Sequence, residues 1–294
     1  MKGRILDTAW GVALYLLLRN DVSWALLSDE DRRRVKAANL KHNTQRPTYA
    51  DPTKYGGGRT YDLPGERRAT AKGALLQDFL DKGNPESILE VGPGSGYYTR
   101  QLVEHPSVKR YAAIDIGGAF IEFLEPRLSQ LKNVDSRLYC GDVITIDLDS
   151  KFEAIVLLSA VHHIPDRLEL FQRLFELLAD GGRIFAFDAA HYLPRLWRLS
   201  KKMVGKGYLT KAYRADVTNL STHHMCTLGE YRKICRRIEG LQIEAAHFGE
   251  HSRPFNWFLK KNQGLTFNQK TWLRFFSSRM AIIMKKTGQD RLQT

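Results

Sequence analysis

The sequence predicts an α/β fold, a three-layer sandwich in which helices cover both faces of a mostly parallel sheet. From Ser87 onward, short apolar runs alternate with segments of helical periodicity, and this alternation is typical of parallel strands joined by crossover helices. The chain has 294 residues, 43% of them hydrophobic, which is enough to bury a sizeable core. The predicted strands are 88–91, 111–116, 137–140, 154–158, 183–187, 241–248 and 280–284.

Helical segments separate these strands. The predicted helices of the sheet region are 97–105, 118–131, 166–179 and 227–239. Gly181 and Gly182 follow the third of them, so we expect the glycine pair to end that helix and turn the chain into the fifth strand.

Residues 1–64 are predicted to form an N-terminal helical extension that ends in a loop. Helical periodicity fits 5–18 and 29–41, and Ser28 can cap the second of these helices. The first apolar run is shorter than the roughly 20 residues needed to cross a bilayer, so we expect a docked or interfacial helix there. Prolines and glycines make 42–64 a loop, and 65–82 returns to helical spacing at the start of the main domain.

The charge of the chain is its one unusual bulk property. A formal net charge of +13 favours anionic partners, although a basic surface that only keeps the protein soluble accounts for it equally well. Three cysteines without CxxC spacing argue against a disulfide framework or a zinc knuckle. We therefore expect reduced thiols, a cytoplasmic protein and no metal site.

The most specific motif is a glycine-rich loop at 90–96, Glu-Val-Gly-Pro-Gly-Ser-Gly, between the first strand and the first crossover helix. Glycines at 92, 94 and 96 let the backbone turn tightly and approach a ligand, while the helix start offers unpaired N–H groups. The spacing differs from the GxGxxG of dinucleotide-binding proteins, because Tyr97 stands where the last glycine would come.

This loop resembles that of the class I S-adenosylmethionine (SAM) methyltransferases, and four further elements resemble the same family. They are Asp115 at the end of the second strand, Gly141-Asp142-Val143 after the third, the segment 154–166 around the fourth, and 177–183 leading into the fifth. The resemblance covers about 86–190 and continues more weakly to 287. It implies a seven-stranded Rossmann-like sheet and SAM as cofactor, with 65–287 as the SAM-binding domain and 288–294 as a tail.

The resemblance also implies a set of cofactor-binding residues. Asp115 would accept both ribose hydroxyls through a charged acceptor, and Asp142 would receive the adenine amine. Arg59 lies in the loop that in related enzymes folds over the methionine end of SAM, where an arginine can pair with the carboxylate. The full set is Tyr55, Arg59, Glu90, Gly92, Gly94, Gly96, Asp115, Ile116, Asp142, Val143 and Ser159.

Histidine is the residue type best suited to remove a proton from an acceptor hydroxyl at neutral pH. His162 follows the fourth strand at the carboxyl edge of the sheet, where ligands bind in open α/β folds, and is the first candidate base. We expect its neighbour His163 to point into packing. His191, after the fifth strand, is the second candidate, and the pair His223 and His224 the third; a site that uses none of them stays open.

Two insertions, about 191–226 and 250–277, fall outside the resemblance. The stretch 191–214 carries seven lysines and arginines and no acidic residue beside an apolar stripe at helical spacing. This pattern is compatible with a substrate lid, a contact with an anionic membrane surface, or a packing or homodimer surface.

The sequence therefore predicts a methyltransferase that acts on a small molecule, with oxygen favoured as the acceptor atom in a natural product, a sugar or a lipid-linked intermediate. The positive charge favours an anionic substrate. Two alternatives remain: methylation of RNA or protein, although no recognisable RNA-binding module accompanies the charge, and a non-catalytic partner subunit with a SAM fold.

Overall fold

The computed structural model describes residues 28–44, 50–54, 58–63, 70–164, 166–189, 227–251, 267–269 and 277–288. The predicted helix 5–18, the insertion 191–226, most of 250–277 and most of the tail lie outside these ranges, as do Tyr55 and His191. Within the described residues, no helix is both long and apolar enough to cross a membrane.

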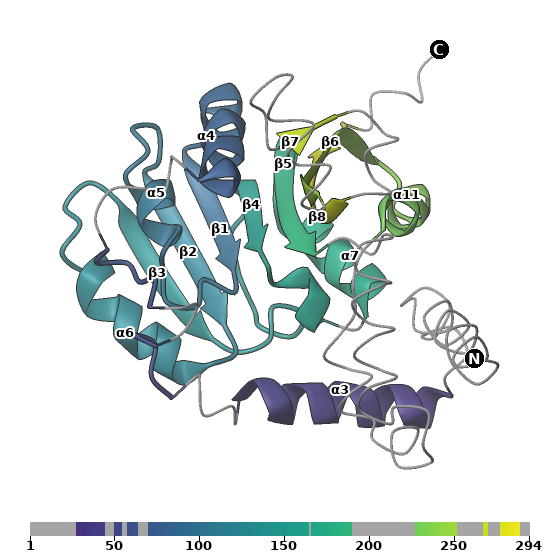
Figure 1. Ribbon diagram of the computed structural model, residues 1–294, viewed down its shortest axis with the longest axis horizontal. Coiled ribbons are helices and arrows are strands. Elements are labelled where there is room, and N and C mark those ends of the chain that lie inside the picture. Colours follow the sequence, from purple (N-terminus) through teal and green to yellow (C-terminus); the bar gives the residue numbers. More distant parts are fainter. Residues whose placement is uncertain are drawn as a thin grey trace, which may run out of the picture.

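The described strands form one mixed sheet in the order β3-β2-β1-β4-β5-β8-β6-β7 (Figure 1). Strands β1 to β5 pair in parallel, whereas β8 runs antiparallel to both β5 and β6. All seven predicted strands are present, and a short eighth strand, β7, pairs with the outer edge of β6. The bounds are β1 Ser87–Val91, β2 Arg110–Asp115, β3 Asp135–Cys140, β4 Phe152–Leu158, β5 Leu178–Ala189, β6 Leu241–His251, β7 Phe267–Asn268 and β8 Ser277–Lys286.

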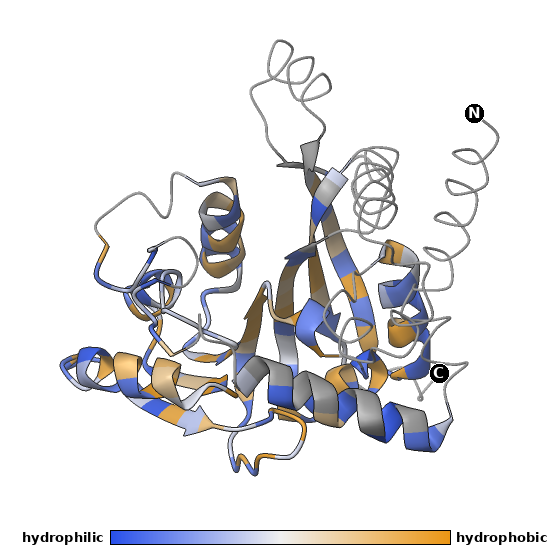
Figure 2. Cartoon of the chain, turned by 60° about the horizontal axis from the view of Figure 1, so that its bottom comes forward, coloured by the Kyte–Doolittle hydropathy of each residue, from blue (hydrophilic) through white to orange (hydrophobic). Residues whose placement is uncertain are grey.

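Helices pack on both faces of this sheet, as predicted for a three-layer sandwich. One hydrophobic cluster joins alternate strand residues to α4 Ala71–Gly83, α5 Thr99–Val103 and α6 Gly118–Leu128, and the other joins them to α7 Arg167–Leu177 and α11 Leu228–Arg237. Leu89 belongs to one cluster and its neighbour Ile88 to the other, because successive side chains of a strand point to opposite faces. Figure 2 shows the apolar central strands between helices of mixed polarity.

Side-chain caps determine where three of the helices begin. The side chains of Thr70, Asp166 and Thr227 accept hydrogen bonds from backbone N–H groups in the first turns of α4, α7 and α11. These caps explain why the helix predicted at 65–82 begins at Ala71, and why those predicted at 166–179 and 227–239 begin one residue later than expected.

The start of β5 differs from the prediction. Helix α7 ends at Leu177 and β5 follows directly, so Gly181 and Gly182 lie inside the strand and do not separate it from the helix. Phe152 pairs with Leu178, but the next pair is Ala154 with Arg183, so one residue on β4 faces four on β5. Gly181, at φ +73°, lies in this bulge, a conformation that glycine adopts at little cost.

The N-terminal helix α3, Asp29–Thr44, crosses the carboxyl edge of the sheet (Figure 1). Lys36 on this helix forms a short ion pair with Glu169 and lies 3.6 Å from a carboxylate oxygen of Asp166 at the start of α7. The predicted extension thus contacts the domain at the edge where ligands bind in such folds.

Candidate active site

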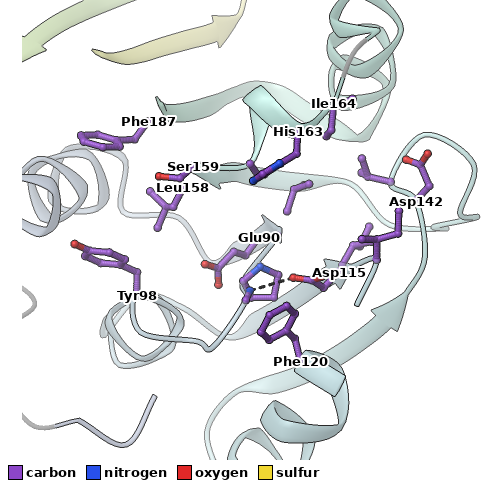
Figure 3. A pocket seen from close by; sticks show the side chains of 18 of the residues that line it. Glu90, Tyr98, Asp115, Phe120, Asp142, Leu158, Ser159, His163, Ile164 and Phe187 are labelled. Atoms are coloured by element: carbon purple, nitrogen blue, oxygen red, sulfur yellow. Dashed lines mark hydrogen bonds between the residues drawn. The ribbon is translucent and has the colours of Figure 1, made fainter. Parts of the chain in front are cut away.

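A cavity of about 910 Å³ opens at the carboxyl edge of the sheet (Figure 3). It lies where β1 is flanked by β2 on one side and β4 on the other, because the chain adds strands outward from β1 in both directions. Such a switch point is the usual ligand-binding position in open α/β sheets, and the volume falls within the range of about 300–1,000 Å³ for small-molecule pockets.

The glycine-rich loop forms the floor of this cavity. Gly92, Gly94 and Gly96 all have positive φ, at 73°, 54° and 72°. A Cβ atom on Gly96 would lie 2.3 Å from a methyl carbon of Leu124, so that glycine is required for packing against α6. Gly92 and Gly94 line the cavity, whereas Gly96 shapes the loop from behind and is absent from the wall.

Asp115 connects the end of β2 to the glycine loop. Its two carboxylate oxygens accept hydrogen bonds from the backbone N–H groups of Gly94, at 3.1 Å, and Gly117, at 2.8 Å. Burial raises the pKa of this carboxyl, while the backbone hydrogen bonds oppose that shift. Each oxygen can accept further bonds, so Asp115 presents charged acceptors to the cavity next to the glycines.

Glu90 lies deeper, at the end of β1, with a side chain that is 2% exposed. One carboxylate oxygen accepts hydrogen bonds from the Thr99 hydroxyl, at 2.7 Å, and the Tyr111 hydroxyl, at 2.6 Å. Burial raises the pKa of Glu90 to about 7, although both hydrogen bonds act to lower it. Glu90 is therefore a cavity-lining carboxyl that changes charge near neutral pH.

The far end of the cavity is bounded by the loop after β3. The side chain of Asp142 accepts a hydrogen bond from the backbone N–H of Ile144, at 3.0 Å, which fixes the turn. The predicted cofactor residues Ile116, Asp142 and Val143 all line this end, together with the ring of Phe120. An apolar slot closed by a carboxylate is a suitable environment for a flat base with an exocyclic amine.

The opposite end carries residues that the sequence analysis missed. The ammonium of Lys72, in the first turn of α4, donates to the Ser159 hydroxyl at 3.3 Å and lies 4.6 Å and 5.0 Å from the ring centroids of Tyr98 and Phe187. Ser159, a predicted cofactor residue, has φ +67°, and its backbone N–H donates to the Phe187 carbonyl at 2.7 Å. Nothing in the helical spacing of 65–82 distinguishes Lys72 from a surface lysine.

The two adjacent histidines after β4 are oriented differently from the prediction. His163 lines the cavity, between Ser159 and Ile164 in Figure 3, so the expectation that it points into packing is wrong. His162 is absent from the wall. Its ring nitrogen Nδ1 lies 2.6 Å from one oxygen of Asp188, and its backbone N–H donates to the other at 3.0 Å.

Of the remaining predicted residues, Arg59 lines the cavity, with its guanidinium 5.8 Å from the ring centroid of Tyr97. Tyr55 and His191 are outside the described residues and their roles stay predictions. In the described part of the chain, His, Cys, Asp and Glu side chains form no group that could hold a metal ion.

Comparison with known proteins identifies the domain that contains this cavity. Residues 89–184, from β1 to the middle of β5, match the family model described as a methyltransferase domain. The fold is also that of the plantazolicin methyltransferase BamL solved with S-adenosylhomocysteine (SAH), with a TM-score of 0.53 and 16% identity over 87% of this chain and 98% of BamL. The N-methyltransferase NodS of Bradyrhizobium japonicum, also solved with SAH, gives a TM-score of 0.50 and 15% identity over 84% of this chain and all of NodS.

Residues 89–184 therefore form a methyltransferase domain, and its fold is that of the class I enzymes. Its cofactor is SAM. Four of the five family elements found in the sequence line the cavity. The glycine loop and Asp115 meet through a hydrogen bond, Asp142 bounds the same space, and the segment around β4 contributes Ser159.

The sequence relatives of this chain are distant. The ubiquinone biosynthesis O-methyltransferase of Pseudomonas fluorescens is 23% identical over 189 residues, which cover 63% of this chain and 70% of that protein. The polyamine aminopropyltransferase of Bacillus subtilis is 25% identical over 147 residues, which cover 46% of this chain and 53% of that protein. The chain thus spans only about half the length of one relative and somewhat more than two thirds of the other.

Proposed function

We propose that this methyltransferase transfers the methyl group of SAM to a hydroxyl oxygen of a small molecule. The observation that carries the proposal is the arrangement of Asp115, which is tied to the glycine loop by Gly94 and faces a cavity whose opposite wall holds His163. A donor bound to Asp115 would point its methyl group toward the wall that holds His163. An acceptor would then bind next to that methyl group.

The two ends of the cavity suit the two ends of the donor. The nucleoside would lie between Asp115 and the slot formed by Val143 and Phe120, with Asp142 at its rim. The amino-acid end would then reach Lys72, whose ammonium suits a carboxylate, while the backbone of Gly92 approaches the donor without obstruction. We propose Lys72 for this role alongside Arg59, the residue predicted from the sequence.

The chemistry asks little of the protein beyond positioning. SAM supplies an electrophilic methyl on a sulfonium, so the residues of this chain must align the acceptor, exclude water and accept a proton. Apolar Leu158, Ile164 and Phe187 line the reacting region, and a histidine on the same wall provides a proton acceptor.

The names of the relatives support a small acceptor. A ubiquinone biosynthesis O-methyltransferase is a sequence relative, and the two structures of the same fold are named for methyl transfer to plantazolicin and as an N-methyltransferase. Side chains of both charge signs line the cavity, among them Lys36, Arg279 and Glu169, so an anionic acceptor would have cations to contact there.

We propose that substrate choice resides in 1–60 and in the insertions at 191–226 and 250–277. Strands β5 and β6 run parallel to each other, since both are antiparallel to β8, so both insertions leave the sheet at the edge that holds the cavity. Arg279, two residues into β8, lines the cavity and supports this placement.

Two measurements test the proposal. Calorimetry with SAH should show binding that Asp115→Ala abolishes, while Asp135→Ala, an exposed aspartate at the start of β3, leaves it unchanged. Methyl-labelled SAM should then label hydroxyl compounds in a panel of phenols, sugars, amines, RNA and peptides, and product mass should show one added methyl.

Three outcomes would contradict it. Label in RNA or peptide favours the macromolecular alternative, and label in amines corrects the acceptor atom. Absence of any heat with SAH would leave only the non-catalytic fold.

A further inference from the structure

We propose that His163 is the residue that takes the acceptor proton, and that His162 and Asp188 are positioning residues that hold it. This inference deepens the proposed function and rests on it. The bond from the donor sulfur to its methyl carbon breaks as the acceptor oxygen attacks that carbon, the hydroxyl proton passes to a ring nitrogen of His163, and the donor leaves as a neutral thioether.

The first argument is where the two rings lie. His163 is on the cavity wall together with Ser159 and Ile164, next to the region assigned to the reacting methyl (Figure 3). His162 is off the wall, and its Nδ1 is engaged by Asp188 at 2.6 Å. A group that accepts a proton from a bound substrate must reach that substrate, and of the two rings only that of His163 meets this requirement.

The second argument is how firmly Asp188 holds this turn. Asp188, at the end of β5, is 1% exposed, and its two oxygens bind the ring and the backbone N–H of the same histidine. The short helix η3, Val161–His163, is thereby fixed to a central strand. A buried carboxylate that makes two charge-assisted hydrogen bonds is a strong restraint on local geometry.

The third argument is the contact that passes this restraint on. The rings of His162 and His163 lie 3.9 Å apart between centroids, at an interplanar angle of 40°. A displaced His162 ring would vacate the surface against which His163 rests. The chain of contacts therefore runs from Asp188 through His162 to the ring on the cavity wall.

An experiment on donor analogues tests this without knowledge of the acceptor. In sinefungin a carbon atom replaces the sulfur of SAM, and an amine on that carbon replaces the methyl group, whereas SAH has neither the amine nor the methyl group. A ring nitrogen beside the reacting centre would accept a hydrogen bond from that amine, so the ratio of sinefungin to SAH affinity reports on His163. Calorimetry would measure both ligands on the full chain.

We expect His163→Ala to lower this affinity ratio about tenfold, as for loss of a hydrogen bond to a charged group, with SAH affinity within twofold of the original. His162→Ala should lower the ratio three- to tenfold. His162→Asn should restore it only in part, because the amide can still donate to Asp188 but the ring that contacts His163 is gone. The double variant should match His163→Ala, since His162 acts through its neighbour.

His105→Ala is the matched control. His105 also pairs with an aspartate, Asp81, at 3.3 Å, but precedes β2 at the other edge of the sheet, and the ratio should not change. An unchanged ratio in His163→Ala, or additive losses in the double variant, would overturn the proposal. Failure of every form to bind SAH would instead refute the proposed function, and His163→Gln provides a second test should the alanine variant not fold.

Discussion

At the scale of single residues, the site depends on two buried carboxyl groups and on a lysine that lies against aromatic rings. Glu90 and Asp115 are acidic residues with raised pKa values, Lys72 rests on two aromatic rings, and each of the three lines the cavity. A charged group that is shielded from water interacts more strongly with a bound ligand, but it destabilises the fold when no ligand is present. Two predictions follow from this balance.

The pKa of Glu90 makes stability depend on pH. The folded value of about 7 exceeds the usual 4.5, so the folded state binds more protons between these values and stability should fall as pH rises from 4.5 to 7. Glu90→Gln removes this dependence. Between pH 4.5 and 7, its free energy of unfolding should therefore rise by about 3 kcal/mol relative to that of the wild type. Urea unfolding at pH 5 and pH 8 would measure it. Equal pH slopes for the two proteins would show that the pKa of Glu90 is not raised.

Lys72→Ala should weaken SAH binding about tenfold, because the carboxylate loses a partly desolvated cation. Methylthioadenosine, which lacks the amino-acid end, should bind both forms equally. Lys82→Ala, on the exposed last turn of the same helix, is the control. Calorimetry would measure both ligands, and an equal loss for the two would move Lys72 away from the donor carboxylate.

At the scale of elements, the local sequence predicted the strands well. The start of a helix could be predicted only where a capping residue marks it. Alternation of apolar runs predicted β1 to β6 and β8, since a buried strand must be apolar along its length. The bulge in β5 was missed because Gly181-Gly182 is an equally good helix-end signal, and pairing with β4 decides between the two. The turn η3 was missed because no local pattern indicates the contact between His162 and Asp188, 26 residues apart.

Helices α7 and α11, which pack on the same face of the sheet, are joined by a buried ion pair. Arg167 of α7 and Glu230 of α11 form a short bond with side chains 2% and 7% exposed. Glu230→Gln should destabilise the fold by about 3–5 kcal/mol, because it leaves a buried guanidinium without its counter-charge. Glu104→Gln removes the exposed partner of Arg100 and should cost less than about 1 kcal/mol. Denaturant unfolding compares them; similar costs would show that burial adds nothing to the first pair.

At the scale of the whole molecule, the cavity joins segments that lie far apart in the sequence. The glycine loop, Asp115 and Asp142 were predictable because a family pattern marks each of them locally. Lys72 and Ser159 meet across 87 positions, and Lys36 and Glu169 across 133, so neither contact leaves a local signal. What the sequence could not supply is therefore the part of the wall contributed by α3 and α4.

The contact between α3 and the start of α7 leads to a kinetic prediction. Helix α3 lies across the cavity edge, where Lys36 lines the cavity and pairs with Asp166 and Glu169. Lys36→Glu would set three carboxylates together and push the helix away, so SAH should dissociate about tenfold faster. Lys41→Glu makes the same charge change on an exposed position of this helix and should leave the rate unchanged. Stopped-flow displacement measures both. If both variants release SAH at the original rate, α3 does not retain the ligand, and the part of the wall it forms serves only the acceptor.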